Sequence, residues 1–172
     1  MRYKILRKQN NDEHCFVCGV KNDAGIRAEF YECVREGSPV LITKFATKDV
    51  HQSYPGRTHG GVISALLDES IGRAVTCTHP EVWAVTIELT VKFRKPVPTN
   101  TPLFIEAFIT KFESRTFEGE GKMMDAKGVV LATAVGKFFR LALETAIPGG
   151  DLGNFNRQVI VEKLPEFIEI GD

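Results

Sequence analysis

Residues 59–78, HGGVISALLDESIGRAVTCT, contain the groups whose types and spacing best suit a chemical site. Their apolar positions recur at the spacing of one buried stripe, which predicts an amphipathic helix. Gly60 and Gly61 would leave backbone N–H groups without intrahelical acceptors in its first turn. Asp68 would follow roughly two turns later, on a narrow face of small residues that leaves room for a ligand. These groups suit attack on an acyl carbonyl, because the amides would stabilise the oxyanion while the carboxylate activates water or attacks directly.

A structural explanation of the same residues stands beside this one. Two glycines before a helix often form only a turn, and an aspartate on an amphipathic helix is usually solvated. Glu69 neighbours Asp68 but would point about 100° away around the helix, so the two carboxylates are not expected to share a site.

Other catalytic motifs are missing from the sequence. It contains no G-x-S-x-G nucleophile elbow, no H-E-x-x-H zinc motif and no glycine-rich phosphate loop. The Cys15-x-x-Cys18 pair has no obvious base, so nucleophilic catalysis by serine or cysteine is disfavoured.

A helix and a sheet would position the candidate groups. Thr58 is a candidate N-cap, and the His79-Pro80 pair would end the helix. Residues 85–94 alternate clearly, with the apolar odd-numbered residues facing one way, so that face is expected to be buried against the helix. Further strands are expected at residues 26–34, 40–47, 103–112, 115–124 and 129–140, with a short helix at 156–164.

This order predicts an α+β fold in which one long helix lies across an antiparallel sheet of about six strands. The short connections after the helix imply that its four following strands are antiparallel neighbours. One helix covers only one face of such a sheet, so a homodimer, or a dimer of dimers, is expected to cover the rest.

The length of 172 residues suits a single domain spanning 1–172, with a turn-rich segment at 1–24 and a C-terminal extension at 146–172. Lysine plus arginine and aspartate plus glutamate each number 22, and this balance argues against a nucleic-acid partner. There is no apolar run long enough for a membrane span and no signal-peptide pattern, so a cytoplasmic location is expected.

The four cysteines do not form a disulfide framework in a chain of this size. His14, Cys15 and Cys18 supply at most three zinc ligands, whereas a structural site needs about four. Redox use of the pair would favour a strand-to-helix junction, and no helix pattern follows Cys18. We therefore expect a compact turn and no bound metal, ahead of zinc binding or dithiol chemistry.

Three segments resemble one known family. PGRTHGGVISALLDESIGRA resembles the HGG-x6-D signature of hotdog-fold acyl-CoA thioesterases of the phenylacetate-pathway type. VTIELTVKFRKPVP resembles the central strand of that family, and CFVCGVKNDAGIRAEF resembles an N-terminal segment of many bacterial members. The resemblance runs from about Cys15 to Arg140 and implies a hotdog fold, thioesterase activity, dimers often paired into tetramers, and no cofactor beyond the coenzyme A of the substrate.

The resemblance also implies roles for individual residues. Asp68 matches the catalytic carboxylate, and Gly60 or Gly61 matches the backbone donor at the helix start. His59 would have a positioning role and would not act mainly as a proton acceptor. Thr86 would help to orient water from the partner subunit, and the nearest matches to an Asn or Gln that precedes the motif in some members are Gln52 and Ser53.

Lys92, Arg94 and Lys95 cluster at a strand end, where they would either contact the phosphates of coenzyme A or form a solvated edge. Two other functions stay open. One is an acyl-CoA-binding protein without turnover, which would not need Asp68. The other is a hotdog dehydratase, for which His51 lacks the expected surrounding sequence. The acyl group itself is not readable from the sequence.

Overall fold

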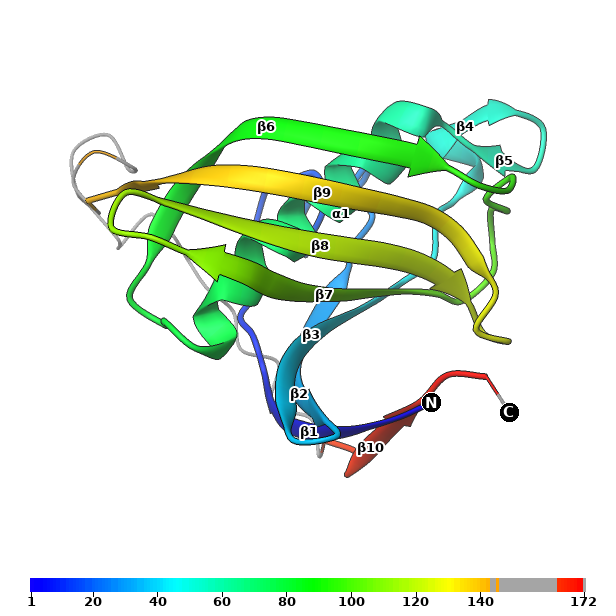
Figure 1. Cartoon of the computed structure of the whole chain (residues 1–172). Helices are drawn as coiled ribbons and strands as arrows, with labels where there is room; N and C mark the ends of the chain where they lie inside the picture. The colour runs from blue at the N-terminus through cyan, green and yellow to red at the C-terminus, as the bar shows by residue number, and fades with distance from the viewer. Residues whose placement is uncertain (143–144, 146–163, 172) are drawn as a thin grey trace.

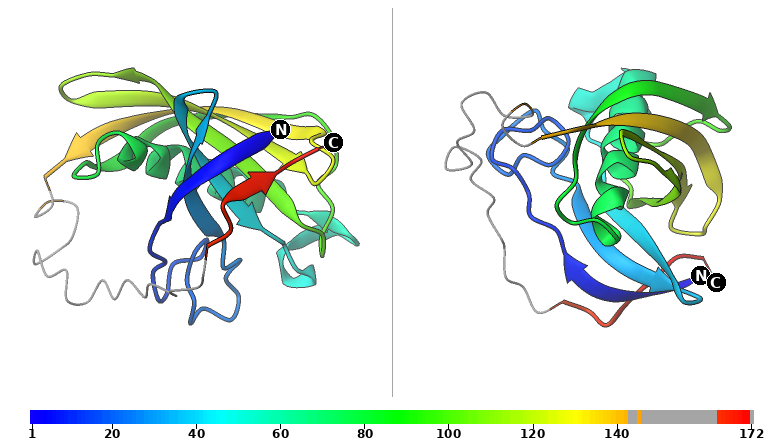
Figure 2. Two further views of the ribbon diagram at one scale, coloured as in Figure 1. Left: turned by 90° about the horizontal axis from the view of Figure 1, so that it is seen from below. Right: turned by 60° about the vertical axis from the view of Figure 1, so that its left-hand side comes forward.

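The computed structural model describes residues 1–142, 145 and 164–171, so the helix expected at 156–164 lies outside the described residues except for Leu164, which is not helical. Its centre is helix α1 (Gly60–Ala74), around which an antiparallel sheet curls (Figures 1 and 2). A single turn of 3-10 helix, η2 (Val75–Cys77), continues α1, and another, η1 (Asp49–His51), lies before it. This confirms one long helix wrapped by an antiparallel sheet.

The main sheet has eight strands in the order β10-β1-β2-β3-β7-β8-β9-β6, and a ribbon of β4 and β5 precedes the helix. Each pair of neighbours is antiparallel. The bounds are β1 Arg2–Lys8, β2 Glu29–Arg35, β3 Ser38–Phe45, β4 Gln52–Tyr54, β5 Arg57–Thr58, β6 Trp83–Phe93, β7 Leu103–Phe112, β8 Thr116–Asp125, β9 Val130–Leu141 and β10 Phe167–Glu169.

The sheet is larger than the expected six strands because β1 and β10 extend it at one end. β1 carries charges along most of its length, and Tyr3 is its one buried residue. β10 has three residues and pairs only with β1. Strands with so little buried surface leave a weak hydrophobic pattern in the sequence.

The four strands after the helix are not consecutive neighbours, contrary to the prediction. β6 pairs with β9, whereas β7 pairs with β3 and β8, so β6 becomes an end strand of the main sheet. The connection between β6 and β7 therefore crosses the sheet, past β8 and β9, rather than forming a hairpin (Figure 1).

Helix α1 buries one face completely against the concave side of the sheet. Ile63, Leu66, Leu67 and Ile71 are all buried in the main core cluster. Burial of each such side chain contributes about 1.5–3 kcal/mol, so this stripe fixes how the helix is rotated relative to the sheet. In consequence, the residues on its flank, Asp68 and Gly72, face toward β6 and β9.

A β-bulge divides β6 into two parts. The pairing with β9 shifts between Thr86 and Glu88, which leaves Ile87 as the extra residue. Ala84 packs against the core before the bulge, whereas Leu89 and Val91 do so after it. The prediction of one continuous odd-numbered face is therefore wrong, because a bulge moves the inward face from even to odd positions.

Gly72 faces a crowded part of the sheet. A Cβ atom there would lie 3.1 Å from Cε1 of Phe138. We expect Gly72→Leu to lower the free energy of unfolding by roughly 1–3 kcal/mol through overpacking. In Gly72→Ala, gained helix propensity should offset the tight contact, leaving little change. Urea unfolding of both variants checks this, and wild-type stability in the leucine variant would contradict close packing at this position.

Candidate active site

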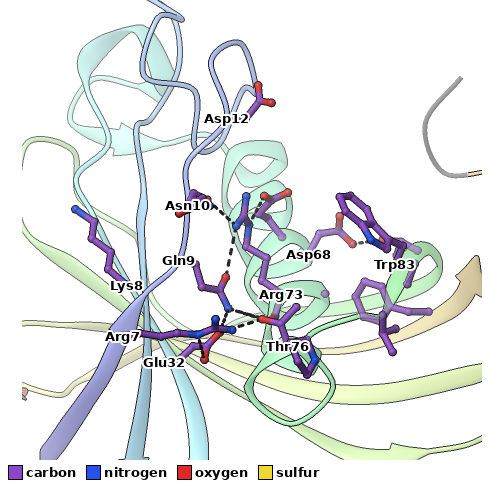
Figure 3. A pocket seen from close by; sticks show the side chains of 17 residues that line it. Arg7, Lys8, Gln9, Asn10, Asp12, Glu32, Asp68, Arg73, Thr76 and Trp83 are labelled. Atoms are coloured by element: carbon purple, nitrogen blue, oxygen red, sulfur yellow. Dashed lines mark hydrogen bonds and ion pairs between the residues drawn. The ribbon is translucent and has the colours of Figure 1, made fainter. Parts of the chain in front are cut away.

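A pocket of about 480 Å³ lies between α1, β6 and the N-terminal segment. One wall is polar and comes from the N-terminal half of the chain and the end of the helix; it includes Arg7, Gln9, Glu32, Arg73 and Thr76. The opposite wall includes Asp68, Gly72, Trp83, Thr86 and Phe138. In Figure 3, Asp68 points from the helix toward the strand of Trp83, whereas Arg73 points toward the N-terminal segment.

The Asp68 carboxylate lies half-buried in this pocket and accepts a hydrogen bond of 2.7 Å from the Thr86 hydroxyl. Thr86 reaches the helix because the bulge at Ile87 keeps it on the inward face. Thr86, which the resemblance assigned to the partner subunit, thus contacts Asp68 of its own chain. Asp68 and Thr86 form a unit that each chain assembles by itself.

The environment of Asp68 raises its pKa above the ordinary value of an aspartate. Burial is the main cause, because it disfavours the charged form. The Thr86 hydrogen bond opposes the shift by stabilising the carboxylate, and the negative charge of Glu69 adds to it. A carboxylate with a raised pKa is a stronger base, and it is therefore a better proton acceptor when it is ionised.

His59 caps the helix in place of Thr58. Its Nδ1 accepts a hydrogen bond of 2.9 Å from the Gly61 N–H, whereas the Thr58 hydroxyl is buried against Thr47. In the neutral ring the proton therefore lies on Nε2, which makes that atom a donor. Within the described residues the Gly60 N–H has no hydrogen-bond acceptor, so Gly60 rather than Gly61 offers the free backbone donor.

Gly60 and Asp68 are well separated within one chain. Eight residues of α-helix span about 12 Å along the axis. A carbonyl carbon being attacked needs its oxyanion donor and its base within about 3 Å of the reacting atoms. One chain therefore cannot present both groups to the same carbonyl.

The other predicted binding residues lie near the start of the helix. Gln52 and Ser53 are exposed on β4, where Gln52 pairs with Thr58, and the Gln52 side chain accepts a hydrogen bond from the Gly56 N–H. Phe93, at the end of β6, lies beside Gly60, and the cations that surround it in sequence, Lys92, Arg94 and Lys95, are all exposed. The structure brings these residues to the Gly60 end of the helix, away from Asp68.

Glu69 also lines the pocket, which its expected position on another face did not predict. Its carboxylate accepts a hydrogen bond of 2.7 Å from Nε of Arg73. That ion pair, between residues four apart on the helix, engages the Glu69 carboxylate, so Glu69 does not form a dyad with Asp68.

The polar wall was not predicted from sequence. Arg7 binds Glu32 through two hydrogen bonds of 2.6 and 2.8 Å, and the Gln9 amide donates to Glu32 and Thr76. These contacts join β1 to β2 and η2, residues far apart in the chain (Figure 3). Alternating charges in β1 are a weak signal for such long-range pairing.

The cysteine segment also differs from the expected ligand group. His14 is exposed, and its ring lies 3.8 Å from the Glu13 carboxylate, away from the thiols. The third potential ligand is instead Glu69, whose carboxylate lies with the Cys15 and Cys18 sulfur atoms within 4.8 Å of one another. Because the Arg73 guanidinium already contacts both Glu69 and Cys18, a positive charge is present beside these groups.

Known proteins resemble this chain in sequence and in fold. Residues 55–132 match the family model described as thioesterase superfamily. A crystal structure of a thioesterase superfamily protein superposes with a TM-score of 0.65 at 24% identity, covering 73% of this chain and 63% of that one. Residues 55–132 are thus similar to the thioesterase superfamily, and the chain has the hotdog fold.

Two further relatives have more specific names. Acyl-coenzyme A thioesterase THEM4 of Mus musculus is 33% identical over 64 residues, which are 37% of this chain and 26% of that protein. The structure of BH2602 from Bacillus halodurans with CoA is 29% identical, with a TM-score of 0.53, covering 58% of this chain and 70% of that one. The aligned segments span less than half the length of the curated relatives they match.

Proposed function

We propose that this chain is an acyl-CoA thioesterase, which hydrolyses an acyl-CoA thioester to a free acid and coenzyme A. The observation that carries the proposal is the half-buried Asp68 carboxylate, held by Thr86 at the wall of a pocket. Asp68 activates a water molecule, or attacks the carbonyl itself, while a helix N-terminal N–H stabilises the oxyanion. Thr86 orients the carboxylate and the water beside it.

The separation of about 12 Å between Gly60 and Asp68 supports a composite site. We propose a homodimer in which the two α1 helices run antiparallel, so that Gly60 of one chain faces Asp68 of its partner. β6 is an end strand of the main sheet, and apolar side chains are exposed on it and on β9, namely Val85, Ile87, Phe93, Val135 and Phe139. An unpaired edge and an apolar patch together favour association through β6.

The coenzyme A moiety would lie near the start of the helix. Lys92, Arg94 and Lys95 are exposed there and offer charge to its phosphates, while His59 Nε2 and Gln52 offer hydrogen bonds. CoA in the BH2602 structure supports a nucleotide-thiol ligand for this fold. The phenylacetate-type relationship and the cytoplasmic location stay predictions. Among the described residues, no helix has the length and apolar character needed to span a membrane.

A panel of aryl, short-chain and medium-chain acyl-CoA esters, assayed by release of free thiol, tests the proposal. Hydrolysis of at least one ester that disappears in Asp68→Asn supports it. Binding of acyl-CoA, measured by calorimetry, without hydrolysis of any ester would instead identify a binding protein.

The hydrogen bonds of His51 argue against the dehydratase alternative. This residue is buried, its Nδ1 accepts from the Lys48 N–H, and its Nε2 lies 2.8 Å from the Ala24 carbonyl oxygen. Both ring nitrogens are therefore engaged in holding the loop before the helix, which leaves neither for acid–base chemistry.

Thr86 should control the acid limb of the pH profile. Thr86→Val removes the donor while keeping the side-chain shape, so the pKa of Asp68 rises further because the bond that lowers it is lost. The base must be ionised, so kcat/KM should begin to fall at a higher pH than in the wild type. Thr86→Ser keeps the donor and is the control. Superimposable profiles for wild type and Thr86→Val would show that the bond does not act on the base.

A further inference from the structure

Four groups from two distant parts of the chain meet beside the pocket. They are the Cys15 and Cys18 thiols, the Glu69 carboxylate and the Arg73 guanidinium. None of them takes part in the proposed hydrolysis. We propose that Cys15 and Cys18 form a redox-active dithiol, a modification site that closes reversibly to a disulfide by exchange with a low-molecular-weight disulfide.

The turn that carries the thiols is built for close approach. The Gly19 N–H donates to the Cys15 carbonyl at 2.8 Å, and a Cβ atom at Gly19 would lie only 2.3 Å from that oxygen. Glycine is therefore required after the second cysteine. The buried Asn11 amide donates to the Cys18 carbonyl, and the Asp12 carboxylate accepts from the Cys15 N–H. These contacts hold both sulfur atoms within 4.8 Å of each other.

Thiol–disulfide exchange requires one attacking thiol and one resolving thiol, and Cys15 and Cys18 differ in this way. Cys15 is partly exposed, and its sulfur accepts hydrogen bonds from the N–H groups of Val17 and Cys18, at 3.3 and 3.4 Å. A hydrogen bond from the Cys18 thiol lowers the pKa of Cys15 to about 7, and the same bond raises the pKa of Cys18. Cys15 is thus the attacking thiol, and buried Cys18 is the resolving one.

The step balances with the small disulfide as oxidant. The Cys15 thiolate attacks one sulfur of that disulfide, which breaks its S–S bond and releases one small thiolate. Cys18 then loses its proton to solvent and attacks Cys15 Sγ, which forms the protein disulfide and releases the second small thiolate. Two electrons pass from the protein to the oxidant.

Arg73 connects this dithiol to the pocket. Its Nη2 donates to Cys18 Sγ at 3.3 Å, its Nε holds Glu69, and its Nη1 donates to the Asn10 carbonyl at 3.1 Å. Oxidation changes the sulfur that Arg73 contacts. The modification therefore acts on a residue of the pocket wall without touching Asp68.

Incubation of the native protein with oxidised glutathione tests the proposal, with mass spectrometry as the readout. We expect a loss of two hydrogen atoms, a disulfide mapped to Cys15 and Cys18, and full reversal by a reducing dithiol. Cys33 and Cys77 are internal controls, because burial raises the pKa of each to about 12. Alkylation of Cys15 by iodoacetamide should accelerate as the pH rises through about 7.

Variants separate the two roles. Cys18→Ser should stop at a stable glutathione adduct on Cys15, whereas Cys15→Ser should form neither adduct nor disulfide, with folding of both checked by circular dichroism. Four reduced cysteines after incubation would overturn the proposal. Zinc bound stoichiometrically, with thiols that react only after chelation, would overturn it in favour of a metal site and would also contradict the metal-free expectation.

Discussion

We expect Asp68→Asn to hydrolyse acyl-CoA thioesters about 10²–10⁴-fold more slowly than the wild type, the usual cost of losing a general base. The substitution keeps the shape of the side chain and still accepts the Thr86 hydrogen bond, but it removes basicity. The exposed cations proposed to contact coenzyme A lie near the other end of the helix. KM should therefore change far less than kcat in steady-state assays.

Two controls accompany this variant. Asp23→Asn makes the same chemical change on an exposed loop carboxylate and should leave kcat unchanged. Glu69→Gln weakens the ion pair with Arg73 but should retain the acid limb that Asp68 produces. Wild-type rates in Asp68→Asn would show that Asp68 is not the base. An acid limb that disappears only in Glu69→Gln would identify Glu69 as the base instead.

Association of two chains through β6 should affect the rate of hydrolysis as strongly as Asp68 does. We expect Ile87→Lys to shift the protein from dimer to monomer in light scattering, because it places a charge on the exposed apolar edge. A monomer would separate the Gly60 donor from the Asp68 it serves. Loss of one oxyanion-hole donor typically costs about 10²–10³ in kcat, and the variant should lose at least that much.

Leu6→Lys is the matched control, since Leu6 is similarly exposed but lies on β1, near the opposite end of the sheet. It should stay dimeric and active. A wild-type protein that is monomeric at micromolar concentration yet active would contradict the composite site, and a dimeric, active Ile87→Lys would show that β6 is not the contact.

Local pattern predicted the parts of the fold that bury an apolar stripe. The helix expected at residues 59–78 is α1 followed by η2, and the strand expected at 103–112 is β7 with the same bounds. These segments have strong periodicity because one face of each is buried. β1 and β10 were missed because these two strands bury few side chains, and periodicity reports burial.

The site was predictable in its residue types but not in its contacts. The spacing from His59 to Asp68 marked the helix, and the alternation of residues 85–94 marked the strand. Which residue of that strand meets Asp68 depends on a bulge, which alternation cannot reveal. The Arg73 contacts with Cys18 and Asn10 join residues more than fifty positions apart, and helix periodicity contains no information about such partners.

The bulge at Ile87 also separates two kinds of contact along one strand. After the bulge, the inward residues Leu89 and Val91 pack against the apolar core, whereas the inward residue directly before it, Thr86, contacts the Asp68 carboxylate. If the same residues formed a regular strand, alternation from Leu89 would place Ile87 and Val85 on the inward face and turn Thr86 away from the carboxylate. The bulge thus decides which side chain of this strand meets Asp68, while the pairing of β6 with β9 continues on either side of it.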